Sequence, residues 1–230
     1  MSDAPAGPAP RDESRARPFV LGVDLDGVCC DHTVAFRRIV ALERGVPEAS
    51  LPLERSWGFE EWGLDDETFT ELNRLAVVEH RMLRDAPVME GASDVLWRLS
   101  DAGVWIRIIT HRLYSNWGHA TAAGDTAHWL DQARIPYRDL CFVGGKTAVD
   151  ADAYIEDAPH NVAAIRAQGR TVIVFDQPYN RELPGPRARN WAEVSEMVTE
   201  LVAAHNGGVQ TQLPGIDAGA DRLDRRLGQG

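Results

Sequence analysis

Short apolar runs alternate with amphipathic stretches along the middle of this chain. The apolar runs show little alternation of polar and apolar side chains, which is typical of strands covered by helices on both faces. They predict strands at 19–24, 104–110, 140–143, 153–156 and 171–175. The amphipathic stretches predict helices at 33–44, 93–102, 120–133, 159–168 and 191–204. Because strands and helices alternate repeatedly, we predict an α/β fold with a Rossmann-like, doubly wound parallel sheet.

Residues 45–88 interrupt this alternation. A run rich in aromatic and turn-forming residues comes first, and a helical pattern follows at 66–83. We therefore predict a small helical cap at 45–88, inserted after the first strand–helix unit. The core would then consist of 18–44 and 89–205.

Composition narrows the possible classes of function. The formal net charge of −11 argues against a surface for nucleic acid polymers or anionic membranes, but it allows a small anionic substrate at a local positive site. No apolar stretch approaches the roughly 20 residues that a membrane span needs. Three cysteines, two of them adjacent, cannot build a disulfide framework and fit a reducing compartment. We expect a cytoplasmic protein with a disordered leader at 1–17, which lacks a secretory signal, and a disordered tail at 206–230.

Two carboxylates follow the first predicted strand. Asp24 and Asp26 are separated by one residue, so both can face one pocket in an extended turn. Their repulsion can be relieved by a divalent cation or by protonation of one acid. A carboxylate is a competent nucleophile toward phosphorus, and a second acid can protonate the leaving oxygen and later deprotonate water. Because the motif is short, a plain turn or a helix cap stays an open alternative.

The only lysine of the chain, Lys146, follows the predicted strand 140–143. An ammonium is a compact point charge that can neutralise phosphoryl oxygens, whereas the arginine fork is wider. The glycines before it suggest a P-loop, but the first glycine of that motif is missing and a strand follows instead of a long helix. Thr110, at a strand end, and the adjacent His111 offer further donors to a phosphoryl group, although Thr110 also suits a helix cap.

Glu156 and Asp157 end the predicted strand 153–156 and suit a Mg²⁺ ligand, since magnesium takes carboxylate oxygens. A calcium loop would need a central glycine and a closing glutamate that this segment lacks. The histidines show no zinc spacing, and Cys29 and Cys30 are interpreted as packing residues.

The order of these residues resembles the four motifs of the haloacid dehalogenase (HAD) superfamily phosphatases, over roughly 18–200. The matching positions are Asp24 to Val28, Thr110, Lys146 and Glu156-Asp157. Within that superfamily the chain is most similar to the 5'(3')-deoxyribonucleotidase family. The segments that carry this closer similarity are 84–92, 179–183, the Asn190-Trp191 pair and the interval from Lys146 to Asp157.

The resemblance implies a phosphomonoesterase that uses Mg²⁺ and forms an aspartyl-phosphate, and it favours a 5'-nucleotidase for (deoxy)nucleoside monophosphates. It makes Asp24 the nucleophile and Asp26 the acid/base. Mg²⁺ would be held by the Asp24 side chain, the Asp26 backbone carbonyl and Asp157, and Thr110 and Lys146 would bind the phosphoryl group. Two departures concern the fourth motif, which reads Glu-Asp, and the residues after Thr110. His111-Arg112 stands where the family commonly has a small residue and proline, which changes the surroundings of the phosphate and the sugar.

Four aromatic residues are candidates for stacking on a nucleobase: Trp57, Phe59 and Trp62 of the cap, and Trp117 near the core rim. Such stacking is worth about 1–3 kcal/mol per base, but the cap residues are equally suited to forming the cap's own core. Two other functions stay open. One is a phosphatase for a sugar phosphate or another small phosphorylated metabolite, and the other is a non-catalytic phospho-receiver domain. A homodimer is common among such enzymes, and the sequence does not decide it.

Overall fold

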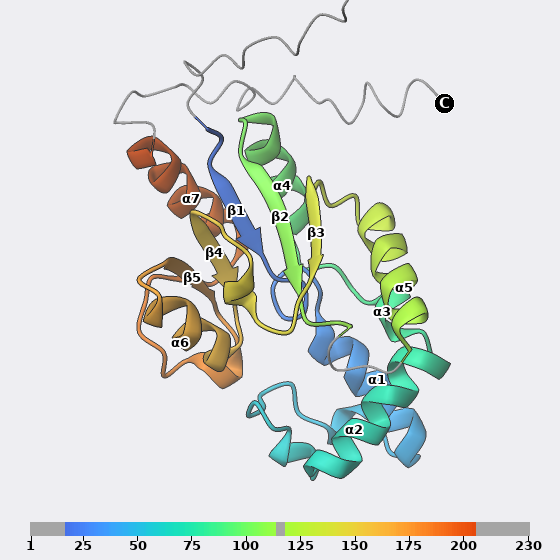
Figure 1. Ribbon diagram of the computed structural model, residues 1–230. Coiled ribbons are helices and arrows are strands. Elements are labelled where there is room, and N and C mark those ends of the chain that lie inside the picture. Colours follow the sequence, from blue (N-terminus) through green and yellow to red (C-terminus); the bar gives the residue numbers. More distant parts are fainter. Residues whose placement is uncertain (1–16, 114–117, 206–230) are drawn as a thin grey trace, which may run out of the picture.

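A computed structural model describes residues 17–113 and 118–205 of the chain (Figure 1). Residues 1–16 of the expected disordered leader lie outside the described residues. The expected disordered tail and Trp117 also lie outside them.

A parallel sheet with strand order β3-β2-β1-β4-β5-β6 forms the centre of the molecule. The strands are β1 Val20–Val23, β2 Trp105–Thr110, β3 Asp139–Phe142, β4 Ala153–Glu156, β5 Thr171–Phe175 and β6 Arg187–Ala188. β1 lies between β2 and β4, with Val23 opposite both Ile108 and Ile155. The predicted α/β class and parallel sheet are confirmed. The short β6 was not predicted, because two residues carry no apolar pattern.

Helices cover both faces of the sheet (Figure 1). The helices of the core are α1 His32–Arg44, α4 Ala92–Asp101, α5 His119–Gln132, α6 Pro159–Ala167 and α7 Trp191–His205. α6 packs Val162 and Ile165 on one face, against a cluster that includes Ile109. α4 and α7 contribute to the larger apolar cluster on the other face, which includes Ile108 and Ile155. Because both faces are buried, the central strands read as apolar runs.

The segment between α1 and α4, here called the insert (45–88), lies beyond the carboxyl ends of the strands (Figure 1). It consists of the short turns η1 Glu48–Ser50 and η2 Glu60–Trp62, followed by α2 Asp66–Arg74, η3 Leu75–Glu79 and α3 Met82–Asp85. Its aromatic side chains pack on α1: the ring of Phe36 lies 5.4 Å from Phe59 and 6.1 Å from Trp62, measured between centroids.

The prediction of one continuous helix at 66–83 is wrong. α2 changes to a π-helical turn at η3, and Arg81 then takes a left-handed conformation with a φ of 56°. The guanidinium of Arg81 binds the fully buried carboxylate of Asp125 in α5, with Nε to Oδ2 at 2.6 Å. This long-range ion pair accompanies the break in the helix. The amphipathic pattern of 66–83 contains no sign of the ion pair, because its acidic partner lies in another helix.

Candidate active site

A cavity of about 410 Å³ opens at the carboxyl edge of the sheet, between the strand ends and the insert. Asp24, Asp26 and Asp157 line its core side, and Trp57 and Phe59 line its insert side. Ligands of open α/β sheets bind at this edge, outside the carboxyl ends of the strands. The topology therefore brings most of the predicted site residues to one place.

Asp24, which lines the cavity, forms a buried ion pair with Lys146, which does not line it. Lys146 begins the turn η4 Lys146–Ala148 after β3, and its ammonium is 2.5 Å from Asp24 Oδ1 and 3.3 Å from Glu156 Oε2. The ammonium also donates to the carbonyl of Ile109. Burial alone would lower the pKa of Lys146, but the negative charges of Asp24 and Glu156 raise it above its ordinary value. The lysine therefore stays charged in the interior.

Asp24, Glu156 and Asp157 together form a buried acidic cluster whose ligand oxygens all lie within 4.8 Å of one another. Burial, and then the neighbouring Glu156, raise the pKa of Asp24 to about 7. Burial and the charge of Asp24 also raise the pKa of Asp157 well above its usual range. One ammonium cannot balance three ionised carboxylates, so the raised pKa values reflect a cluster that needs protons or a further cation. An all-oxygen donor set of this kind fits a hard divalent cation such as Mg²⁺.

The side chain of Asp26 points to a different partner, Arg112. The Arg112 guanidinium, which is buried, binds the Asp26 carboxylate with Nη2 at 2.7 Å and Nε at 3.0 Å. Thr126 Oγ1 and the ring of Trp129 lie against the same guanidinium. Burial would raise the pKa of Asp26, but Arg112 outweighs this effect and lowers the pKa to about 2. In the sequence, Arg112 stands out only as a departure from the family, because nothing local marks it as the partner of Asp26.

We expect Arg112→Met to lower the free energy of unfolding by about 3 kcal/mol, since breaking a buried ion pair leaves an uncompensated charge. The pair stabilises the fold above the ordinary pKa of aspartate near 4, and this stabilisation is lost as the pH falls through about 2. Urea unfolding at pH 7 measures the loss. The matched control is Arg181→Met, which removes an exposed pair with Glu54 and should lower the stability much less, because solvent screens exposed charges. Equal effects of the two variants would contradict the prediction.

Thr110 and His111 follow β2 at the same edge. Thr110 is almost fully buried, its Oγ1 accepts from the backbone N–H of Arg112 at 3.3 Å, and it does not line the cavity. His111 does line the cavity, and its buried Nε2 has no hydrogen-bond partner among the described residues. Its ring faces that of His160, with centroids 6.5 Å apart. Burial lowers the pKa of both imidazoles, so His111 presents a neutral ring with an unused nitrogen to the cavity.

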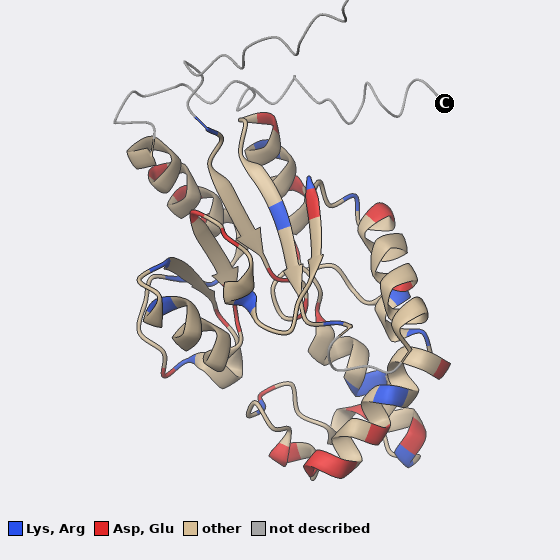
Figure 2. Ribbon diagram, in the orientation of Figure 1, with Lys and Arg blue, Asp and Glu red and all other residues tan. Residues whose placement is uncertain are grey.

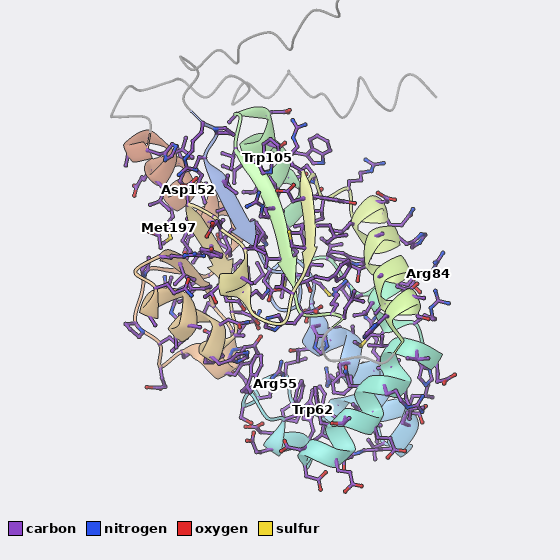
Figure 3. The ribbon with its side chains drawn as sticks, in the orientation of Figure 1. Arg55, Trp62, Arg84, Trp105, Asp152 and Met197 are labelled. Carbon is purple, nitrogen blue, oxygen red and sulfur yellow. The ribbon has the colours of Figure 1, made fainter. Side chains whose placement is uncertain are left out.

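The aromatic candidates fall into two groups. Trp57 and Phe59 line the cavity, and the Trp57 side chain is about half exposed. Trp62 does not line it; this side chain is buried in the insert and donates Nε1–H to the carbonyl of Pro52 at 2.8 Å. Figure 3 shows Trp62 inside the insert and Arg55 on the side of the insert that faces the core. For Trp62, the structure therefore favours the interpretation as cap core.

Several residues that line the cavity were not predicted as site residues, and among them are Arg55, His160 and Tyr179. The guanidinium of Arg55 is buried between two rings, 3.8 Å from the centroid of Phe59 and 4.4 Å from that of Tyr179. The Tyr179 hydroxyl donates to Asp157 Oδ2. The only sequence signal was the similarity of segment 179–183 to the deoxyribonucleotidases, which assigned no role to the tyrosine.

Gly27 closes the turn that carries Asp24 and Asp26. Its φ of 85° is in the left-handed region, and a Cβ atom at this position would overlap with Asp157 Oδ2. We expect Gly27→Ala to displace Asp157 and lower kcat/KM by about 100-fold, because shifts of about 1 Å in a catalytic group have effects of this size. The control is Gly145→Ala, which adds a methyl group in open space beside Lys146. Steady-state kinetics on both variants would test this, and similar rates for the two would contradict it.

The sheet order and the flanking helices define a fold class, the one found in solved structures of the HAD superfamily. The chain is similar to the crystal structure of a HAD-superfamily hydrolase, subfamily IA, variant 1, from Geobacter sulfurreducens PCA, with a TM-score of 0.51, 14% identity, and coverage of 79% of this chain and 100% of that one. A dehalogenase solved with an intermediate complex has the same TM-score at 12% identity, over 78% of this chain and 96% of its own. At these identities the likeness concerns the fold.

Residues 17–206 match the model of the family "5' nucleotidase, deoxy (Pyrimidine), cytosolic type C protein", and the chain belongs to this family. The chain is also 45% identical over 187 residues to a protein of Chlorobaculum tepidum named "Putative 5'(3')-deoxyribonucleotidase", covering 80% of this chain and 92% of that protein. These findings make the chain a phosphoric monoester hydrolase. Among the described residues, no helix combines the length and the apolar character that crossing a membrane requires.

Proposed function

We propose that this chain is a Mg²⁺-dependent 5'-nucleotidase that hydrolyses (deoxy)nucleoside monophosphates through an aspartyl-phosphate. The observation that carries the proposal is the convergence of Asp24, Lys146 and Asp157 on one buried site in a member of this family. Cytoplasmic location remains a prediction that accompanies it, and a homodimer stays an open alternative.

Asp24 is the proposed nucleophile. One of its carboxylate oxygens would form a bond to phosphorus as the bond between phosphorus and the ester oxygen breaks, and the nucleoside leaves with a proton on that oxygen. Water then attacks phosphorus, the Asp24–phosphorus ester bond breaks, and phosphate is released. The Lys146 ammonium, 2.5 Å from Asp24, is suited to neutralising the phosphoryl oxygens, and Thr110 and His111 are proposed as further donors.

Asp26 is the proposed acid/base. Its contact with Arg112 favours the ionised carboxylate, which is the form that deprotonates water in the second step. To protonate the leaving oxygen in the first step, Asp26 must leave Arg112, since the ion pair opposes proton uptake. A movement of Asp26 from Arg112 toward the cavity would therefore accompany substrate binding.

Asp24, Asp157 and the backbone carbonyl of Asp26 are the proposed Mg²⁺ ligands, and Glu156 completes the acidic cluster. When bound, the cation supplies charge that offsets the repulsion between a phosphate dianion and these carboxylates. Figure 2 shows acidic residues, in red, along α2 and the turns next to it, which agrees with a small substrate held at a local site and not with a polyanion.

The insert is proposed to act as a cap that shields the reaction from water. Trp57 and Phe59 line the cavity opposite the acids, so a base attached to the reacting phosphate would meet these two rings. Trp117 was proposed for the same role and lies outside the described residues. A sugar phosphate would leave this aromatic surface unused.

The test is a panel of deoxyribo- and ribonucleoside monophosphates against sugar phosphates. We expect kcat/KM for the best nucleotide to exceed that for the best sugar phosphate by at least about 10-fold, as stacking of 1–3 kcal/mol implies. Removing divalent metal with EDTA should abolish turnover, and adding Mg²⁺ should restore it. If every nucleotide is inert while another phosphate ester turns over well, the nucleotidase proposal fails. A long-lived phospho-form without turnover would favour the receiver function instead.

A further inference from the structure

The turn around η5 Pro178–Asn180 holds two distant parts of the site at once. Asn180 Nδ2 donates to the backbone carbonyl of Asp157 at 2.8 Å, and the Tyr179 hydroxyl donates to the Asp157 carboxylate. From the same turn, Gln177 Nε2 donates to the carbonyl of Gly27 at 2.7 Å. Gly27 belongs to the turn of Asp24 and Asp26, so one short segment joins both acidic motifs.

The turn itself is rigid for local reasons. Gln177 and Asn180 bond to each other's backbone in a reciprocal capping arrangement, and Asn180 also donates to the carbonyl of Phe175 at the end of β5. Asn180 is almost fully buried. A buried side chain held by these bonds has little freedom to rotate, so it ties the backbone of Asp157 to the end of β5.

Tyr179 is the member of this turn that reaches the reactive carboxylates. Its bond to Asp157 uses Oδ2, the oxygen against Gly27, and leaves the second oxygen for another partner. On the side of the insert, its ring contacts Arg55 and Trp57, with the ring of Trp57 at 5.2 Å. The tyrosine therefore lies between the proposed metal ligand and the proposed cap.

We infer that Tyr179 is a positioning residue that orients Asp157 for the divalent cation and links this carboxylate to the insert. The inference rests on the metal site of the proposed function. A carboxylate held by a hydrogen bond on one oxygen loses less rotational freedom when its other oxygen binds a cation. Loss of such an outer hydrogen bond typically weakens metal affinity 10–100-fold.

The test is Tyr179→Phe, which keeps the ring and its contacts with Arg55 and Trp57 and removes only the hydroxyl. Mn²⁺ is titrated calorimetrically into the metal-free full-length protein, without substrate. We expect the Kd to rise about 10-fold or more. The Mg²⁺ concentration for half-maximal activity should rise by a similar factor, while kcat at saturating Mg²⁺ stays within about threefold of the wild type.

The matched control is Tyr154→Phe. Tyr154 is also buried, and its hydroxyl contacts Val149 and Arg170, on the α6 face of the sheet. The Tyr154→Phe variant should have the same Kd for Mn²⁺ as the wild type, even if its Tm is lower than that of Tyr179→Phe. An unchanged Kd in Tyr179→Phe would overturn the inference, whatever happens to its Tm. A raised Kd in a protein that hydrolyses no nucleotide would uphold the inference and refute only the nucleotidase proposal.

Discussion

Asp24→Asn is expected to lower kcat by about 10⁴-fold or more, because an amide cannot form the aspartyl-phosphate and removal of a nucleophile has effects of this order. The contact with Lys146 places Asp24 beside the only ammonium side chain of the chain, which makes this carboxylate the best candidate to attack phosphorus. The measurement is kcat with p-nitrophenyl phosphate and with the best nucleotide of the panel. A wild-type rate in this variant would contradict the assignment of Asp24 as the nucleophile.

The fold of Asp24→Asn should persist, and its stability gives a second check. Burial raises the pKa of Asp24 to about 7, so the folded protein binds a proton more tightly than the unfolded chain does. Without metal, the wild type should therefore lose stability as the pH rises from about 4 to 7. The asparagine variant does not titrate at this position. The difference in free energy of unfolding between the variant and the wild type should therefore shift in favour of the variant from pH 5 to pH 8. The control for charge is Asp150→Asn, because the side chain of Asp150 is 90% exposed. This substitution should change neither kcat nor the pH dependence of stability.

Lys146→Met is expected to lower kcat by about 10²–10³-fold, the usual effect of removing one fixed donor to the charge that develops in a transition state. The methionine keeps the length of the side chain and removes the ammonium. Lys146→Arg should not restore activity, because the guanidinium is wider than the space shared by Asp24, Glu156 and the carbonyl of Ile109. Rates are compared at saturating Mg²⁺ and substrate.

The loss of the ammonium also leaves Asp24 and Glu156 without their cation, so Lys146→Met should unfold at a lower urea concentration than the wild type. Assays are therefore run where circular dichroism shows that the variant is folded. Arg38→Met, which removes an exposed cation from α1, is the control and should keep full activity. A folded Lys146→Met within about twofold of the wild-type kcat would remove the lysine from the mechanism.

The strands were predicted well because their signal is local. β4 and β5 cover the predicted residues, since a strand buried on both faces must be apolar throughout, whatever its neighbours are. The helix ends lie within a residue or so of the prediction for the same reason: the apolar stripe of a helix that packs on a sheet is visible in sequence. The insert was harder, because the ion pair between Arg81 and Asp125 joins residues that lie 44 positions apart.

The same distinction between local signals and long-range contacts applies to the residues of the site. Asp24, Lys146 and Asp157 were predicted from sequence because each follows an apolar run, and the carboxyl ends of parallel strands meet at one edge of the sheet. The partners of these acids were not predictable. Arg112 is 86 positions from Asp26 and Tyr179 is 22 positions from Asp157. Sequence by itself determined which chemical groups reach the edge of the sheet. Only the tertiary structure decided which of these groups are in contact. Hydrogen bonds and ion pairs depend on distances between residues far apart in the sequence, and local sequence patterns do not specify those distances.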